Sequence, residues 1–86
     1  MLGTLEDGRI ALEELSRFNN TPIRDGERMY WNIPALLDGI RVGLSKAGAL
    51  GQMITSVSTD AWGVDYALLD SAGEIIEPVF HYRDPR

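Results

Sequence analysis

One stretch of the sequence, about residues 32–48, is long and regular enough to form an amphipathic helix. Its apolar residues recur every three or four positions, as on one helix face: Ile33, Leu36, Leu37, Ile40, Leu44 and Ala47. Asn32 suits the N-cap, and Pro34 suits the first turn, where its missing amide hydrogen is not needed. Gly48 or Gly51 can end the helix. A helix flanked on both sides by short strand-like runs predicts an α/β or α+β fold.

The chain before this helix predicts a β-hairpin. Residues 2–5 form a short apolar run, residues 6–8 carry an Asp-Gly turn signal, and a second run begins at Ile10. Residues 11–15 are also good helix formers, so the residues alone leave helix and strand open for the second run. Residues 19–28 contain Asn-Asn, Thr-Pro and Asp-Gly pairs and are predicted to be a loop.

The chain after the helix predicts further strands. Residues 53–60 are rich in β-branched residues, which is typical of a buried strand. Residues 63–70 predict another strand, followed by a turn at residues 70–73 and a short final strand. The expected order is therefore an N-terminal β-hairpin, one helix, a strand and a C-terminal β-hairpin. Gly39 and Gly43, four residues apart, are expected to let the helix pack closely on a sheet.

Composition excludes several classes of function. The chain has 86 residues, enough for one domain at most. A net charge of −5 argues against binding to nucleic acids or anionic membranes, which requires a basic face. The sequence has no bilayer-length apolar run and no signal segment, so we expect a cytoplasmic protein. With no cysteine and one histidine, it predicts no disulfide, thiolate nucleophile, zinc ribbon or His-rich metal site.

The pair Trp62-Gly63 is the most unusual local feature. Glycine lets a ligand or another backbone approach closely, and an indole beside it offers a flat apolar wall with one N–H donor. Sugar pockets use this pairing and so do ordinary turns, so both interpretations stay open. The flanking Asp60 and Asp65 are either a carboxylate pair for acid–base or metal chemistry, or a strand end and a solvent-facing residue.

The C-terminal stretch holds the other chemistry-bearing residues. His81 is either a surface or hydrogen-bonded histidine, or a base, and the first interpretation is the commoner one. Arg83, Asp84 and Arg86 form either a charged rim or a solvated loop. The sequence has no Gly-x-Ser-x-Gly elbow and no glycine-rich phosphate loop, so no catalytic residue, cofactor-binding residue or metal ligand is assigned.

Three segments together resemble the first domain of the FGGY sugar kinases, in the rhamnulokinase subgroup. They read RFNN, YWNIPALLDGIRVGLSKA and TDAWGVDYALLDSAGEIIEPVFHYRDPR, and they cover nearly the whole chain in order. WGVDYALLD and YRDPR are specific to that subgroup. The resemblance implies a ribonuclease H-like fold of the actin/hexokinase type, of which residues 1–86 would be a single partial domain. It also implies that residues 10–18 are a strand rather than a helix.

The resemblance further implies a function. The longer protein would transfer the γ-phosphate of Mg-ATP to L-rhamnulose and form L-rhamnulose 1-phosphate. Gly63 would contact the ketose at the floor of a cleft, and Trp62 would form a neighbouring wall. The family usually has Thr where this chain has Ala61, which leaves open another deoxy-ketose such as fuculose.

The resemblance also places essential kinase parts outside this segment. The family's phosphate loop would precede it, and the catalytic aspartate and the second, nucleotide-binding domain would follow it. We therefore expect the 86-residue chain alone to be inactive and to bind neither ATP nor Mg²⁺. A second hypothesis, from a different class, is a non-catalytic module that forms homo-oligomers through an exposed strand edge.

Overall fold

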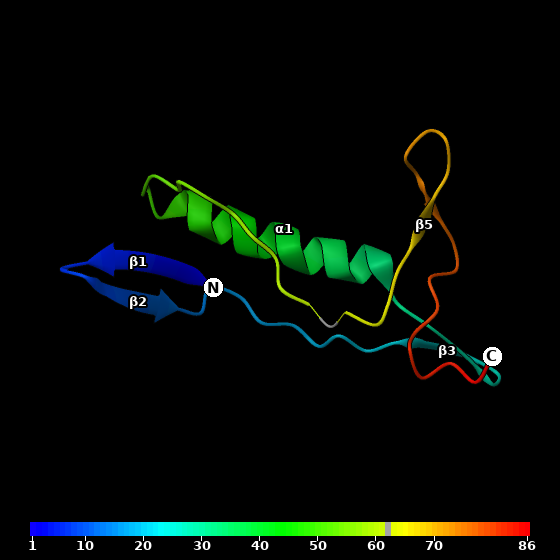
Figure 1. Cartoon of the computed structure of the whole chain (residues 1–86). Coiled ribbons are helices and arrows are strands. Elements are labelled where there is room, and N and C mark those ends of the chain that lie inside the picture. Colours follow the sequence, from blue (N-terminus) through cyan, green and yellow to red (C-terminus); the bar gives the residue numbers. More distant parts are fainter. Residues whose placement is uncertain (62) are drawn as a thin grey trace. The chain divides into compact units, whose positions relative to one another are not determined.

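The computed structural model describes residues 1–61 and 63–86 (Figure 1). Its elements are, in chain order, β1 (Leu2–Glu6), β2 (Arg9–Glu13), β3 (Ile23–Asp25), β4 (Arg28–Tyr30), α1 (Ile33–Ala49), β5 (Leu68–Leu69) and β6 (Ile75–Ile76). In this described part, the strands form three antiparallel pairs, β1–β2, β3–β4 and β5–β6. The predicted mixture of one helix with antiparallel hairpins is confirmed.

Two compact units make up the chain. The first consists of residues 1–19 and 35–58, and the second of residues 20–34 and 59–86. Among the described residues, the only buried hydrophobic side chains are Met29 and Val79, and both belong to the second unit. No helix in the described part is long and apolar enough to cross a membrane.

The N-terminal hairpin forms where the sequence predicts it. Glu6 pairs with Arg9, so Asp7 and Gly8 make a two-residue loop. Their φ angles are 50° and 74°, and this pair of left-handed residues is the type I′ geometry that Asp-Gly favours. The expected strand over residues 10–18 is wrong beyond Glu13. Glu13 pairs with Leu2, and β1 has nothing further to offer residues 14–18 as a partner.

The loop predicted for residues 19–28 is wrong in its second half, which contains β3 and the start of β4. The pair Asp25–Arg28 closes a two-residue loop in which Gly26 has a φ of 59°. The Asp-Gly signal was a correct turn prediction. The hairpin around it was missed because its strands, of three residues each, are too short to show an alternating pattern.

The predicted helix is confirmed, and α1 begins directly after Asn32. Gly51, with a φ of 69°, lies just beyond its end in the conformation typical of a helix terminus. Gly39 and Gly43 on the helix are half-buried. Leu37, Ile40 and Leu44 are 42–51% exposed. Half of the predicted apolar face therefore lacks cover in the described part of the chain.

Close packing at Gly39 is confirmed, but its neighbour is not a sheet. A methyl group added at Gly39 would overlap the ring of Phe18, and one at Gly43 would lie 3.7 Å from the Cβ of Ser16. Both neighbours belong to the irregular segment after β2. The glycines thus make room for that segment against α1.

The strand predicted over residues 53–60 is wrong. These residues form neither helix nor strand, and Met53 and Val57 are 89% and 71% exposed. β-branched residues favour extended backbone, but a strand also needs a partner, and in the described chain none pairs with this segment. The strand predicted over residues 63–70 is right only for β5, where β6 supplies the partner.

The predicted turn at residues 70–73 is confirmed by its hydrogen bonds. The Asp70 amide donates to the Glu74 carbonyl at 2.8 Å, and Gly73 has a φ of 81°. The carboxylate of Asp70 accepts from the amides of Ala72 and Glu74 at 2.8 and 2.9 Å. Asp70 and Gly73 therefore shape this hairpin together, which is the usual role of these residue types in turns.

Candidate functional site

The C-terminal segment lies along β4. The Trp31 amide donates to the Val79 carbonyl at 2.8 Å, and the His81 amide donates to the Met29 carbonyl at 3.0 Å. Between these bonds, Tyr30 and Phe80 form an antiparallel bridge with ring centroids 5.3 Å apart. Residues 79–81 thus extend the β3–β4 hairpin and bring the end of the chain onto it.

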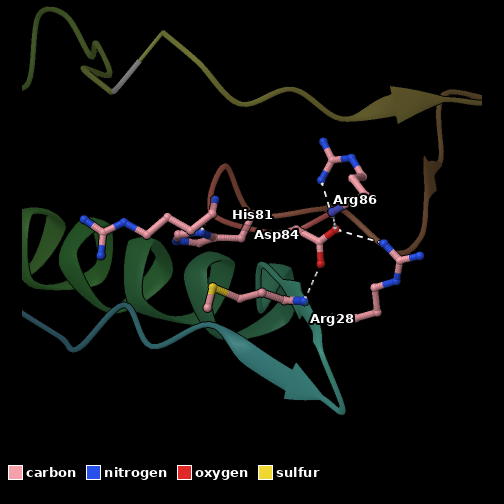
Figure 2. Close-up of polar contacts among 6 residues, drawn as sticks. Arg28, His81, Asp84 and Arg86 are labelled. Carbon is pink, nitrogen blue, oxygen red and sulfur yellow. Dashed lines mark hydrogen bonds and ion pairs between the residues drawn. The ribbon is translucent and has the colours of Figure 1, made fainter.

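A buried carboxylate, Asp84, fixes this arrangement. Its side chain has no exposed surface, and Oδ1 accepts from the Met29 amide at 2.7 Å. Oδ2 accepts from Arg28 Nη1 at 3.2 Å and from the Arg86 amide at 3.1 Å. Figure 2 shows Asp84 pointing toward Arg28 and Arg86. Of the two interpretations for residues 83–86, the structure rules out a solvated loop for Asp84.

Electrostatics at Asp84 balance burial against hydrogen bonding. Burial alone would raise the pKa of the carboxyl group. The amides of Met29 and Arg86 and the guanidinium of Arg28 favour the charged form, and together they outweigh the burial. The pKa of Asp84 therefore lies below its ordinary value, and the group is a carboxylate at neutral pH.

His81 is buried, with 6% of its surface exposed, and its ring contacts two aromatic rings. The centroids of Trp31 and Tyr82 are 4.2 and 4.3 Å from the imidazole centroid. His81 Nδ1 accepts a hydrogen bond from the Arg83 amide at 3.0 Å. The structure thus favours a hydrogen-bonded structural histidine over a base.

An open pocket of about 350 Å³ lies in the second unit. Half of its lining residues are aromatic, and the lining carries one carboxylate and one guanidinium: Val64, Asp65, Tyr66, Phe80, Tyr82 and Arg86. Mostly apolar walls with a few polar groups are typical of small-molecule sites. Arg86 is fixed over Phe80, with its guanidinium carbon 4.4 Å from the ring centroid.

Asp65 lines this pocket and is held in place by a hydrogen bond. Trp31 Nε1 donates to Asp65 Oδ2 at 2.6 Å, which joins the end of β4 to the segment after Gly63. Asp65 is half-buried, whereas Asp60 is exposed. Asp65 is thus neither a solvent-facing residue nor dependent on Asp60 for a partner. In the described part of the chain, no group of three or more His, Asp or Glu residues could hold a metal ion.

The residues predicted to bind substrate lie next to this pocket or outside the described residues. Gly63 is exposed in a turn, with open space within 4 Å of a Cβ built on it, and its neighbour Val64 lines the pocket. Trp62 lies outside the described residues. Sequence reasoning missed Trp31 and Phe80 as parts of the site. The cluster of aromatic side chains in the stretch VFHY was the available signal for Phe80.

Comparison with known proteins shows which proteins this chain resembles. The chain is 40% identical over 85 residues to a rhamnulokinase of Bacteroides thetaiotaomicron, covering 99% of the chain. Rhamnulokinases of Ligilactobacillus salivarius and Bacillus subtilis are also 40% identical and cover 100% of the chain. The chain is thus similar, over its whole length, to one segment of these rhamnulokinases. No protein-family model matches the chain.

The match covers nearly all of this chain but only a small part of each rhamnulokinase. The chain spans about 18% of the length of these curated relatives. The predicted resemblance to rhamnulokinases is therefore confirmed for the sequence. The pocket and the Asp84 cluster both lie within the part of the chain that these relatives match.

Proposed function

We propose that this chain supplies part of the ketose-binding region of an FGGY sugar kinase. The longer protein would transfer a phosphoryl group from ATP to the 1-hydroxyl of L-rhamnulose, a cytoplasmic step of rhamnose catabolism, on a ribonuclease H-like fold. The observation that carries the proposal is the 40% identity to proteins named rhamnulokinase over the whole chain. The pocket next to Gly63, lined by three aromatic rings, a carboxylate and a guanidinium, supports a role in sugar binding.

Nucleotide and metal binding are assigned, as part of this proposal, to regions of the longer protein outside this segment. The described residues contain no metal-binding cluster, and the sequence contains no glycine-rich phosphate loop. Phosphoryl transfer depends on both parts. The purified 86-residue chain is thus expected to form no ADP from ATP in the presence of L-rhamnulose, and steady turnover in that assay would contradict the assignment.

Gly63 and Trp62 are proposed to contact the ketose. The support from the structure concerns Gly63, which is exposed, has free space where a side chain would be, and precedes the pocket residue Val64. A side chain at Gly63 would occupy the space through which a ligand approaches. A larger residue there is expected to weaken binding of the ketose without disturbing the fold.

A chimaeric kinase tests this proposal. The 86-residue chain replaces the matching segment of the rhamnulokinase of Bacteroides thetaiotaomicron, and KM for L-rhamnulose is measured. Gly63→Leu is expected to raise KM about tenfold, because the leucine side chain would keep the ketose away from the surface at Gly63 and weaken its binding. Gly48→Leu is the matched control, since Gly48 also has open space, and it should leave KM unchanged. An unchanged KM for Gly63→Leu removes Gly63 from the site.

Two further proposals have their own support. Ala61 stands where the family usually has Thr, so L-fuculose is the alternative deoxy-ketose substrate. Self-association is the alternative role of the chain by itself. It is favoured by the exposed apolar face of the β1–β2 hairpin, where Leu5, Ile10 and Leu12 are 71%, 71% and 66% exposed.

A further inference from the structure

The pocket of the second unit combines two kinds of wall. Tyr66, Phe80 and Tyr82 supply ring surface, on which the C–H face of a small ring molecule can lie. Asp65 and Arg86 supply one group that only accepts hydrogen bonds and one that only donates them. A polyhydroxylated molecule needs both, because each hydroxyl is a donor and an acceptor.

Both charged groups are held by partners of their own. Trp31 Nε1 donates to Asp65 Oδ2 at 2.6 Å. Asp84 accepts the Arg86 amide at 3.1 Å and lies 3.7 Å from the Arg86 guanidinium. Groups fixed before a ligand arrives lose less conformational freedom on binding, which strengthens the complex.

Asp65 keeps acceptor capacity for a ligand. A carboxylate offers about four lone-pair sites, and the Trp31 bond occupies one of them. Asp65 is half-buried, so a hydrogen bond to it is screened less than at an open surface. The remaining sites belong to a residue that lines the pocket.

We propose that Asp65 accepts hydrogen bonds from hydroxyl groups of the bound ketose and that Trp31 is its positioning residue. This inference rests on the proposed function, because it assigns contacts within the same ketose-binding region. Trp31 sets which carboxylate oxygen faces the pocket. Arg86 is the charged hydrogen-bond donor of the pocket and donates to oxygen atoms of the ketose.

The test uses the purified 86-residue chain labelled with ¹⁵N and titrated with L-rhamnulose. The indole Nε1–H resonance of Trp31 is the reporter, and its loss in Trp31→Phe assigns it. It is expected to shift in a saturable way, because ligand binding at Asp65 perturbs the hydrogen bond that Trp31 donates. Absence of a saturable shift overturns the inference.

Three variants separate binding from folding. Asp65→Asn removes the charge but keeps the shape, and it should weaken binding about tenfold because a charge-assisted hydrogen bond becomes a neutral one. Asp38→Asn is the matched control, an exposed carboxylate on α1 paired with Arg41, and it should bind as the native chain does. The amide resonances of Met29 and His81 report the fold in each variant. Equal affinity of Asp65→Asn and the native chain overturns the inference.

Trp31→Phe keeps an aromatic ring and removes the N–H donor. It should lower the ratio of affinities for L-rhamnulose and L-fuculose, which differ in the configuration of one hydroxyl, because an unbraced carboxylate accepts from either. A purely structural role would lower both affinities and leave their ratio unchanged, and that result overturns the role of Trp31.

The outcomes of the chimaera and of the binding test together separate this inference from the proposed function. If the chimaera is active on L-rhamnulose and the Asp65→Asn chain binds the ketose as the native chain does, this inference alone is overturned. Asp65-dependent binding with an inactive chimaera supports it and overturns the kinase proposal.

Discussion

Of the glycines in α1, Gly39 has the least room for a side chain. A methyl group there overlaps the ring of Phe18, whereas Gly48, on the same helix, has open space. Gly48→Ala is therefore expected to raise the free energy of unfolding by about 0.5–1 kcal/mol through helix propensity. Gly39→Ala should gain the same propensity but displace Phe18, for a net loss of about 1 kcal/mol. Urea unfolding followed by circular dichroism measures both.

A double variant separates the two effects at Gly39. In a Phe18→Ala background the overlapping ring is gone, so Gly39→Ala should stabilise the chain as Gly48→Ala does. If Gly39→Ala destabilises the chain equally with and without Phe18, the packing account of this glycine is wrong.

Single residues show why part of the site was beyond prediction. Gly63 is exposed in a turn with open space where a side chain would be, and its contact with the ketose stays a prediction. The hydrogen bond between Trp31 and Asp65 joins residues 34 positions apart, and a local sequence pattern cannot predict a contact between residues so far apart in the chain. The prediction for Trp62 as a wall stays a prediction.

At the scale of elements, Asp84 joins β4 to the C-terminal segment, and its charge makes this junction sensitive to acid. A carboxyl group whose pKa is lowered by folding adds stability at pH values above its unfolded pKa, about 3.9. That stability is lost as the pH falls through the lower pKa of the folded state. The native chain is therefore expected to lose stability below about pH 4 through this group.

Asp84→Asn tests this account of the junction. The variant should be less stable at neutral pH and should lose less stability on acidification, because the group that titrates is gone. Amide exchange at Met29 and His81, the residues that join the segment to β4, should be about tenfold faster. Asp38→Asn, in an exposed ion pair, is expected to leave the stability and the amide exchange of Met29 and His81 unchanged. An unaltered acid transition in Asp84→Asn would contradict the assignment.

Elements were predictable where a local signal was strong and partners were near in sequence. The β1–β2 and β5–β6 hairpins follow from Asp-Gly and from Asp70 with Gly73, and α1 follows from its spacing. The strand predicted at residues 53–60 failed because propensity cannot supply a partner. The pairing of β4 with residues 79–81 was missed because it joins distant segments.

At the scale of the whole molecule, the described chain leaves much apolar surface exposed. The β1–β2 hairpin presents Leu5 and Ile10 side by side on one face, both 71% exposed. The isolated chain is expected to self-associate as its concentration rises, and light scattering gives the mass. Replacing both residues with Thr should shift the mass toward the monomer. Leu68→Thr, at an exposed position in the other unit, is the control.

A constant monomer mass of the native chain over the accessible concentration range would rule out the self-associating module. The same mass for the native chain and the Leu5→Thr/Ile10→Thr variant, at an associated size, would move the contact to another surface. The exposed face of α1, with Leu37, Ile40 and Leu44, is the next candidate.

The most direct test of the central claim is the sugar preference of the unmodified chimaera, in which this chain replaces the matching segment of the Bacteroides thetaiotaomicron rhamnulokinase. The measurement is kcat/KM for ATP-dependent phosphorylation of L-rhamnulose and of L-fuculose. If the chain supplies a working part of the ketose-binding region, the chimaera phosphorylates L-rhamnulose and prefers it over L-fuculose. A folded chimaera that phosphorylates neither sugar would contradict the account, and a preference for L-fuculose would transfer the function to the alternative substrate.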